Sequence, residues 1–174
     1  MLLHAAARQG DTRALRRLLD TGQDVDKADA HGFTALFYAA RESQLDAVKL
    51  LLERKAAVDR CKEGSMTGAT RRSLVGGSIL TTAHCAFAAL MVALEADDHA
   101  IVATLLEGGA EVNKRAGLHR ESPLMTAVRA RCVRCAQRLL ECKAEPTAEA
   151  AGGYTALDLA KQRRNGIEIE AVLQ

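Results

Sequence analysis

Two cysteines three positions apart are the residues of this chain whose types and spacing are most typical of site chemistry. Cys132 and Cys135 form the segment CVRC, and a C-x-x-C spacing occurs both in zinc sites and in redox-active disulfides. A tetrahedral zinc site needs a second pair of ligands, and no nearby C-x-x-C or H-x-x-x-H segment provides one. We therefore expect these two side chains to pack as ordinary core residues, with a zinc or redox site as the alternative.

The other potentially reactive residues form no recognisable catalytic or cofactor-binding motif. Cys61, His84, Cys85 and His119 have no spacing typical of a metal site. The glycine pairs of the chain lack the lysine and the serine or threonine of a phosphate-binding loop. The order of residues assigns no Ser-His-Asp or Cys-His arrangement. We predict that the chain is not an enzyme, binds no metal and needs no cofactor.

The length and composition limit the classes of protein to which the chain can belong. A chain of 174 residues supports one domain or one short repeat array. It contains 33 alanines, two prolines and no tryptophan, a composition that favours closely packed helices. The net charge of +2 is too small to indicate nucleic-acid binding, and no apolar run is long enough to insert into a membrane. A helical protein is the simplest expectation.

An internal repeat organises the chain. The segment HGFTALFYAA at 31–40 returns as GGYTALDLAK at 152–161, and aligned leucines recur at steps of 33, 54, 34 and 33 residues. These leucines are Leu3, Leu36, Leu90, Leu124 and Leu157. Twelve residues after each leucine begins a second apolar cluster, namely LRRLL, VKLLL, VATLL, AQRLL or IEAVL. Apolar residues at i, i+3 and i+4 predict an amphipathic helix, so each unit is expected to contain two helices.

These residues resemble the ankyrin repeat, whose pattern runs roughly G-x-T-P-L-H-x-A-A, a short turn, V-V-x-L-L and G-A-D-V-N. The resemblance implies an all-α fold, a solenoid of stacked helix-turn-helix units with projecting β-hairpin fingers. It places a single domain over residues 1–174, with repeats at approximately 1–27, 28–60, 61–114, 115–147 and 148–174. No such unit buries its apolar faces alone, so stacked neighbours are expected to form the core.

Several individual residues gain a structural role from the repeat register. Thr34 and Thr155 are placed to cap an inner helix, and Gly32 and Gly153 to turn the finger that precedes it. Position 143 and its equivalent, position 55, carry lysine where the family normally has a glycine with left-handed backbone. Each of these lysines should cost on the order of 1 kcal/mol.

The register also bears on the cysteines and on the cellular compartment. It puts Cys135 at a normally buried position of an outer helix, Cys132 at the start of that helix and Cys142 near its end. This placement favours packing over zinc or redox chemistry. Five cysteines without a secretory segment indicate a reducing compartment, where we expect the thiols to be free. The expected location is the cytoplasm, with the nucleus or an organelle as alternatives.

The third unit carries an insertion of about 21 residues, spanning roughly residues 61–83. Glycine, serine and threonine make its first part a predicted loop. An enlargement at the finger edge extends the surface without entering the core. The apolar residues of SLVGGSIL favour packing on the stack or on a partner, and an exposed loop is the alternative.

By resemblance, the chain is expected to bind a partner protein on a concave surface formed by finger tips and inner-helix ends, together with the inserted loop. The residues at these positions are Arg8, Ala30, His31, Phe33, Arg41, Glu42, Arg71, Arg72, Leu74, Glu95, His119, Glu121, Arg129 and Tyr154. The arginines at the helix ends favour an acidic or mixed-charge partner segment, or they are simply a solvated face. Phe33 and Tyr154 are candidate aromatic anchors, and Phe33 alternatively packs between fingers.

Two functions are compatible with these features. The first is a non-enzymatic scaffold or adaptor that binds a partner protein. The second is a structural accessory subunit that is permanently incorporated in a larger multiprotein assembly. A groove that depends on ion pairs weakens steeply with salt, whereas an obligate apolar interface does not.

Overall fold

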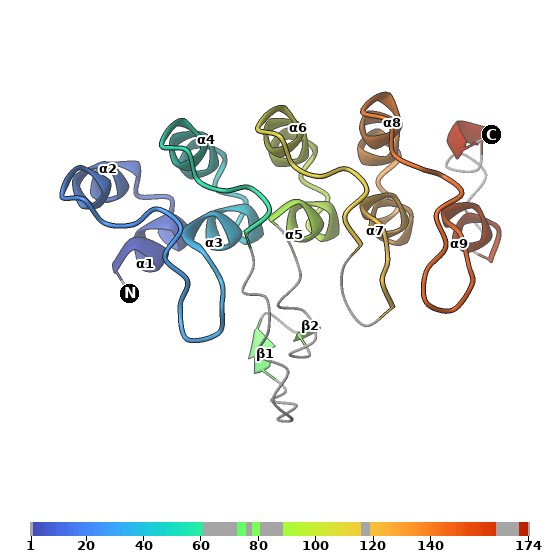
Figure 1. Cartoon of the computed structure of the whole chain (residues 1–174), viewed down its shortest axis with the longest axis horizontal. Helices are drawn as coiled ribbons and strands as arrows, with labels where there is room; N and C mark the ends of the chain where they lie inside the picture. The colour runs from blue at the N-terminus through green and yellow to red at the C-terminus, as the bar shows by residue number, and fades with distance from the viewer. Residues whose placement is uncertain are drawn as a thin grey trace.

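The computed structural model describes residues 2–60, 73–75, 78–80, 89–115, 119–162 and 171–173. Within these ranges the helices form two rows, which Figure 1 shows one above the other. The inner row contains α1 (Leu2–Gln9), α3 (Ala35–Arg41), α5 (Ala89–Glu95), α7 (Pro123–Ala130) and α9 (Ala156–Gln162). The outer row contains α2 (Thr12–Asp20), α4 (Leu45–Glu53), α6 (His99–Glu107) and α8 (Val133–Glu141). No helix among these residues has the length and apolarity needed to span a membrane.

The core lies between the two rows and between successive units. Each inner helix packs on the next inner helix from α1 to α9, and each outer helix packs on the next outer helix from α2 to α8. The leucines that define the repeat, Leu3, Leu36, Leu90 and Leu124, are at most 2 % exposed. The small residue three positions later is buried as well, at Ala6, Ala39, Ala93, Ala127 and Ala160. Small side chains at these contacts let neighbouring helices approach closely. The two rows of stacked helices confirm the predicted all-α solenoid.

Side-chain caps fix where the inner helices begin. Thr34 and Ser122 each accept a hydrogen bond at 3.3 Å from the backbone N–H three residues later. Thr155 accepts the same bond from Asp158 at 3.3 Å, and the Asp158 carboxylate accepts the Thr155 backbone N–H at 2.8 Å. This reciprocal pair satisfies two backbone donors that the helix leaves without a partner. The predicted caps at Thr34 and Thr155 are therefore confirmed.

Left-handed backbone occurs at the turns that the sequence predicted. Gly32 and Gly153 have φ angles of 89° and 73° at the bends of their fingers. Lys55 and Lys143 have φ angles of 62° and 66°, although each carries a Cβ. The helix stops after α4 and α8 therefore use a conformation that L-residues other than glycine adopt at a cost.

The fingers are tight turns in the structure. Asp29 donates its N–H to the Phe33 carbonyl at 2.9 Å, and Ala150 donates its N–H to the Tyr154 carbonyl at 2.9 Å. The described finger residues contain an isolated bridge at Glu121 and no β-strand. The predicted β-hairpin form of the fingers is thus not confirmed in this part of the chain.

A ladder of side-chain bonds links successive units behind the fingers. Asp26, Asp59 and Asn113 each accept a backbone N–H from the next unit, at 2.9, 2.8 and 2.9 Å. The Asn113 amide also donates to the Lys143 carbonyl at 3.4 Å. These bonds fix the register of one unit on the next, because each one joins residues about thirty or more positions apart in the chain.

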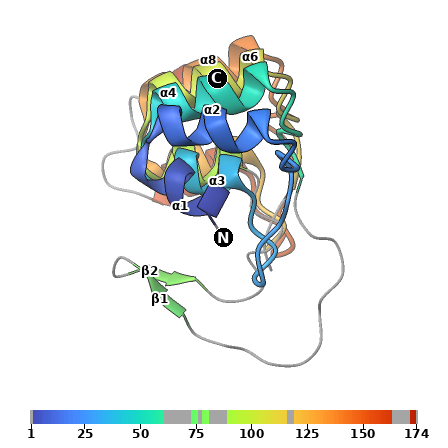
Figure 2. The ribbon, with the colours of Figure 1, turned by 90° about the vertical axis from the view of Figure 1, so that its left-hand side faces the viewer.

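The inserted segment contains the two described strands. β1 (Ser73–Val75) and β2 (Ser78–Leu80) pair antiparallel, with Leu74 opposite Ile79. Figures 1 and 2 show them away from the helices, on the side toward which the fingers project. These strands were not predicted, although the glycine pair between two short apolar runs in SLVGGSIL is typical of a hairpin. Residues 61–72 and 81–88 lie outside the described part.

Candidate functional site

Three arginines of the predicted partner surface occupy equivalent positions. Arg8, Arg41 and Arg129 each lie in the last turn of an inner helix. Because the inner helices stack in register (Figure 1), these turns follow one another along the same edge of the array. The three side chains are 59 %, 18 % and 45 % exposed. We call this set the arginine strip; Glu95, at the exposed end of α5, lies between its second and third members.

Carboxylates of the chain itself accompany the arginine strip. The Glu42 Oε1 atom lies 2.9 Å from a guanidinium nitrogen of Arg41 and 3.5 Å from one of Arg8. Glu42 therefore joins the ends of the first two inner helices. Arg129 pairs with Glu121 from the segment before its own helix. The predicted surface is consequently mixed in charge, with positive and negative groups alternating along it.

Glu121 and Tyr154 connect the last described finger to this surface. Glu121 is only 9 % exposed, and its Oε1 accepts a hydrogen bond from the Tyr154 hydroxyl at 2.8 Å. Both residues were predicted to contact the partner. In the structure they contact each other across 33 positions of chain, so Tyr154 is half-buried and oriented by a carboxylate.

Phe33 packs against the inner helix that follows it. Its ring stacks on Phe37 at a centroid distance of 4.1 Å and meets Tyr38 edge-on at 6.1 Å. Offset-stacked and edge-on pairs are the favoured aromatic geometries. Phe33 therefore packs on the inner helix of its own unit, whereas the stated alternative was packing between fingers, and its side chain keeps part of its surface exposed.

Asp29 and Tyr38 form a polar pair that the sequence analysis did not single out. The Tyr38 hydroxyl donates to Asp29 at 2.7 Å. Burial alone would raise the pKa of Asp29, but hydrogen bonds from Tyr38 and from two backbone N–H groups outweigh it and hold this pKa below its ordinary value. Burial, helped by the bond to Asp29, raises the pKa of Tyr38 to about 12. Arg41 lies 5.6 Å from the Tyr38 ring centroid, so this pair supports the arginine strip.

The remaining predicted contact residues divide into two groups. Those that the structure describes are exposed on the fingers, at Ala30, His31 and His119. Arg71 and Arg72 lie outside the described residues. Leu74 lies in β1, and its side chain also falls outside the described part.

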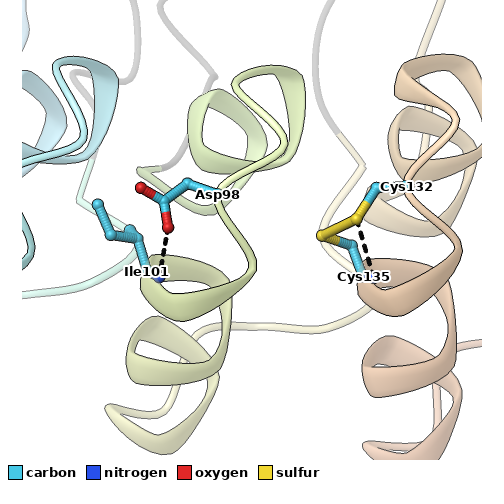
Figure 3. Close-up of a disulfide and its surroundings, with 4 residues drawn as sticks. All are labelled: Asp98, Ile101, Cys132 and Cys135. Carbon is cyan, nitrogen blue, oxygen red and sulfur yellow. Dashed lines mark hydrogen bonds between the residues drawn. A yellow bond between two sulfur atoms is a disulfide. The ribbon is translucent and has the colours of Figure 1, made fainter.

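Cys132 and Cys135 form a disulfide, which corrects the expectation that all thiols are free. Their Cα atoms are 5.2 Å apart, within the range that a disulfide spans, because one turn of helix separates the cap of α8 from its third residue. Both side chains are buried, at 5 % and 0 % exposed, and for Cys135 the register predicted this burial. Figure 3 shows the pair at the start of α8. Cys142, the C-cap of the same helix, is free, and Cys61, His84 and Cys85 lie outside the described residues.

Comparison with known protein families identifies the repeat. The family model described as "Ankyrin repeats (3 copies)" matches residues 1–62 and 90–172. The stretch between the two matched parts contains most of the inserted segment. The match therefore covers both sides of the insertion and most of the chain.

Comparison with curated proteins finds relatives in animals and fungi. The chain is 27 % identical over 157 residues to Ankyrin repeat protein nuc-2 of Neurospora crassa, covering 83 % of the chain and 15 % of that protein. It is 29 % identical over 108 residues to Ankyrin repeat and SOCS box protein 3 of Homo sapiens, covering 62 % and 17 %. It is 43 % identical over 56 residues to Ankyrin repeat, SAM and basic leucine zipper domain-containing protein 1 of Equus caballus, covering 31 % and 12 %. The chain spans less than a fifth of each relative.

Proposed function

The chain belongs to the ankyrin-repeat family, whose repeats generally mediate protein–protein interaction, and we propose that it is a scaffold or adaptor that binds a partner protein. The family is typically non-enzymatic. In this proposal the partner binds across the ends of the inner helices and the finger tips, and the hairpin β1–β2 extends the same surface. We further propose an intracellular location.

The arginine strip is the observation that carries this proposal. Arg and aromatic side chains contribute much of the energy at protein interfaces. On two adjacent inner helices, Glu42 joins Arg8 to Arg41, whose guanidinium lies over the Tyr38 ring. In the Arg8–Glu42 pair the arginine side chain is 59 % exposed and the glutamate side chain 34 %. Exposed ion pairs contribute about 0–1 kcal/mol, so a partner can exchange this pair for its own contacts at little cost.

The pairing of the strip indicates the chemistry of the partner. Glu42 and Glu121 place negative charge beside the three arginines. A purely acidic segment would meet repulsion from these two carboxylates, whereas a segment with alternating charges matches both signs. We therefore propose a mixed-charge partner segment, with carboxylates at Arg8 and Arg129 and a cation at Glu42.

A charge-reversal comparison tests the proposal. The variant Arg8→Glu/Arg129→Glu changes the strip, and the matched control Arg13→Glu/Arg16→Glu changes the same number of exposed arginines on the outer helix α2. Partners are captured on the wild-type chain and on both variants, and are quantified by mass spectrometry across a salt series. We expect the wild-type chain and the control variant to capture a common set of partner proteins at low salt. The strip variant should fail to capture this set, and rising salt should release it from the wild-type chain.

The other outcomes contradict the proposal in distinct ways. Equal capture by all three proteins would show that the strip does not bind. A partner that stays bound at high salt on both variants would instead favour a structural subunit held by an apolar interface.

A further inference from the structure

The outer helices share one N-capping position, and α8 has a cysteine there. Asp11 and Asp98 each accept a hydrogen bond from the N–H three residues later, at 2.9 and 3.1 Å. In α8 the Cys132 Sγ atom accepts the equivalent bond from the Cys135 N–H at 3.0 Å. Figure 3 shows the carboxylate of Asp98 and the sulfur of Cys132 in these matching roles. A sulfur atom thus sits where the positive end of the helix dipole favours an anion, which for cysteine is the thiolate.

A carboxylate from the preceding unit approaches the two sulfur atoms. Asp97 lies in the turn between α5 and α6, with left-handed backbone at φ 57°. A carboxylate oxygen of Asp97 and the Sγ atoms of Cys132 and Cys135 all lie within 4.8 Å of one another. Among the described residues, this is the one group of at least three His, Cys, Asp or Glu side chains close enough together to hold a metal ion. The group is not apparent from the sequence, because Asp97 is 35 positions before Cys132 and meets the cysteines only through the stacking of the third unit on the fourth.

We propose that the reduced Cys132–Cys135 pair binds a zinc ion, with Asp97 as the third protein ligand. Zinc binds thiolate sulfur at about 2.3 Å and carboxylate oxygen at about 2.0–2.2 Å, so the ligand atoms of a tetrahedral site lie roughly 3.3–3.8 Å apart. The three groups reach that spacing by small side-chain shifts once the sulfur–sulfur bond is open. Two thiolates select a thiophilic cation over magnesium or calcium, and a water molecule fills the fourth position.

The burial of the group fits a metal site that is shielded from solvent except on one side. Cys132 and Cys135 are 5 % and 0 % exposed, whereas Asp97 is exposed. The sulfur atoms are therefore shielded from bulk solvent, and the cation approaches from the side of the carboxylate. Packing alone accounts for Cys135 in the core, but it gives no reason for a carboxylate beside both sulfur atoms.

The oxidation state of the pair controls this site. The disulfide holds no lone thiolate for a metal, so it must first gain two electrons and two protons. Two molecules of a small thiol, such as glutathione, supply both and become a disulfide themselves. Zinc then displaces the two thiol protons when it binds. Metal and disulfide exclude each other, and the reduced state is the binding state. This inference is independent of the proposed partner surface.

Metal titration of the reduced chain tests the inference directly. The background variant Cys61→Ser/Cys85→Ser/Cys142→Ser leaves the C-x-x-C pair as the source of thiols, and its circular dichroism is compared with that of the wild-type chain. After reduction and anaerobic removal of the reductant, Co²⁺ is added as a spectroscopic substitute for zinc. We expect thiolate-to-cobalt charge-transfer absorption that saturates at one Co²⁺ per chain and disappears when Zn²⁺ displaces it.

Further variants separate the three ligands. Adding Cys132→Ser and Cys135→Ser to the background should abolish the absorption. Adding Asp97→Asn should weaken Zn²⁺ binding by about tenfold or more, the scale on which losing even an outer partner weakens metal sites. Adding Asp46→Asn, which changes an exposed carboxylate in the first turn of α4, should leave binding unchanged.

Each other result overturns the inference. Absence of charge-transfer absorption in the reduced protein removes the metal site, and equal Co²⁺ binding by the oxidised protein removes the role of the thiolates. Equal affinity of the Asp97→Asn and Asp46→Asn variants removes the third ligand. If the background variant does not fold, the same titration compares the reduced wild-type chain with Cys132→Ser/Cys135→Ser, whose difference in bound Co²⁺ must be one per chain.

Discussion

At the scale of single residues, the turns after α4 and α8 show how a side chain on left-handed backbone changes stability. Lys55 and Lys143 hold left-handed backbone at positions where equivalent units have Gly22 and Gly109, with φ angles of 83° and 91°. Replacing each lysine by glycine should raise the free energy of unfolding by on the order of 1 kcal/mol, because glycine adopts this conformation without steric cost. Urea denaturation of Lys55→Gly, Lys143→Gly and the double variant measures the effect, which should be additive for sites this far apart.

The reverse substitution provides a control for the same argument. A Cβ built on Gly22 or Gly109 meets no heavy atom within 4 Å, so only the backbone conformation opposes a side chain there. Gly109→Lys should therefore lower the free energy of unfolding by a similar amount. A Gly109→Lys protein with an unchanged free energy of unfolding, or lysine-to-glycine variants without gain, would contradict the assigned cost.

The Asp59 side chain makes one hydrogen bond fewer than the side chain at the equivalent position of another unit, Asn113. Burial raises the pKa of Asp59, although the hydrogen bond from the Glu111 N–H opposes this rise, and its Oδ1 atom is buried without a hydrogen-bond partner. Asn113, at the equivalent position, uses an amide N–H to reach the Lys143 carbonyl. Asp59→Asn should donate in the same way to Gly109 and raise the free energy of unfolding by up to about 1 kcal/mol at neutral pH.

The pH dependence of this gain has a definite sign. An acid whose pKa is raised in the folded state loses stability as pH rises through that pKa, so the penalty at Asp59 is complete at neutral pH and absent below the ordinary value of 3.8. The difference between Asp59→Asn and the wild-type chain should shrink as pH falls from 7 toward 4. A difference that grows in acid would show that the carboxylate stabilises the fold.

At the scale of the helix, the chain offers a direct test of capping. Ser122 is 2 % exposed and begins α7 with a side-chain hydrogen bond, followed by a proline at the first helical position. Ser122→Ala should lower the free energy of unfolding by about 1–2 kcal/mol, since it leaves a buried N–H without a partner. Ser122→Thr is the matched control, because Thr34 and Thr155 perform the same role in other units. Thermal unfolding should place the threonine variant near the wild-type chain.

The elements were predictable from sequence because each one leaves a local, periodic signal. Apolar spacing marked both helices of a unit, and Thr34 and Gly32 marked where an inner helix and its finger begin. The hairpin β1–β2 was missed because the segment was interpreted as a loop with apolar residues that pack, without regard to the glycine pair between its two short apolar runs. Its signal was present in SLVGGSIL.

The candidate site was less predictable because it depends on contacts between units. Repeat register placed Arg8, Arg41 and Arg129 at helix ends, and it also gave the burial of Cys135. It did not reveal that Glu42 bridges two helices. A carboxylate partner is chosen by stacking geometry, and neighbouring helices meet at residues that no fixed spacing in the sequence identifies.

At the scale of the whole molecule, the insertion leaves the stack continuous. Helix α3 packs on α5 across the inserted segment, just as α1 packs on α3 and α5 packs on α7. In Figure 1 the inner row accordingly continues from α3 to α5 as it does between the other inner helices. Since stability in such arrays comes from each unit and its contacts with neighbours, we expect the array to fold without the insertion.

Deletion of residues 63–80 tests this continuity. Because the cost of closing a loop grows only slowly with its length, the deletion should change the free energy of unfolding by less than about 1 kcal/mol and leave a single unfolding transition. Leu90→Ala, which removes a fully buried side chain of α5, is the contrasting variant and should cost about 2–5 kcal/mol. Partner capture by the deleted chain then isolates the role of the hairpin in binding. Separate unfolding of residues 1–60 and 89–174 after the deletion would mean that the inserted segment, rather than the contact between α3 and α5, couples the two halves of the array.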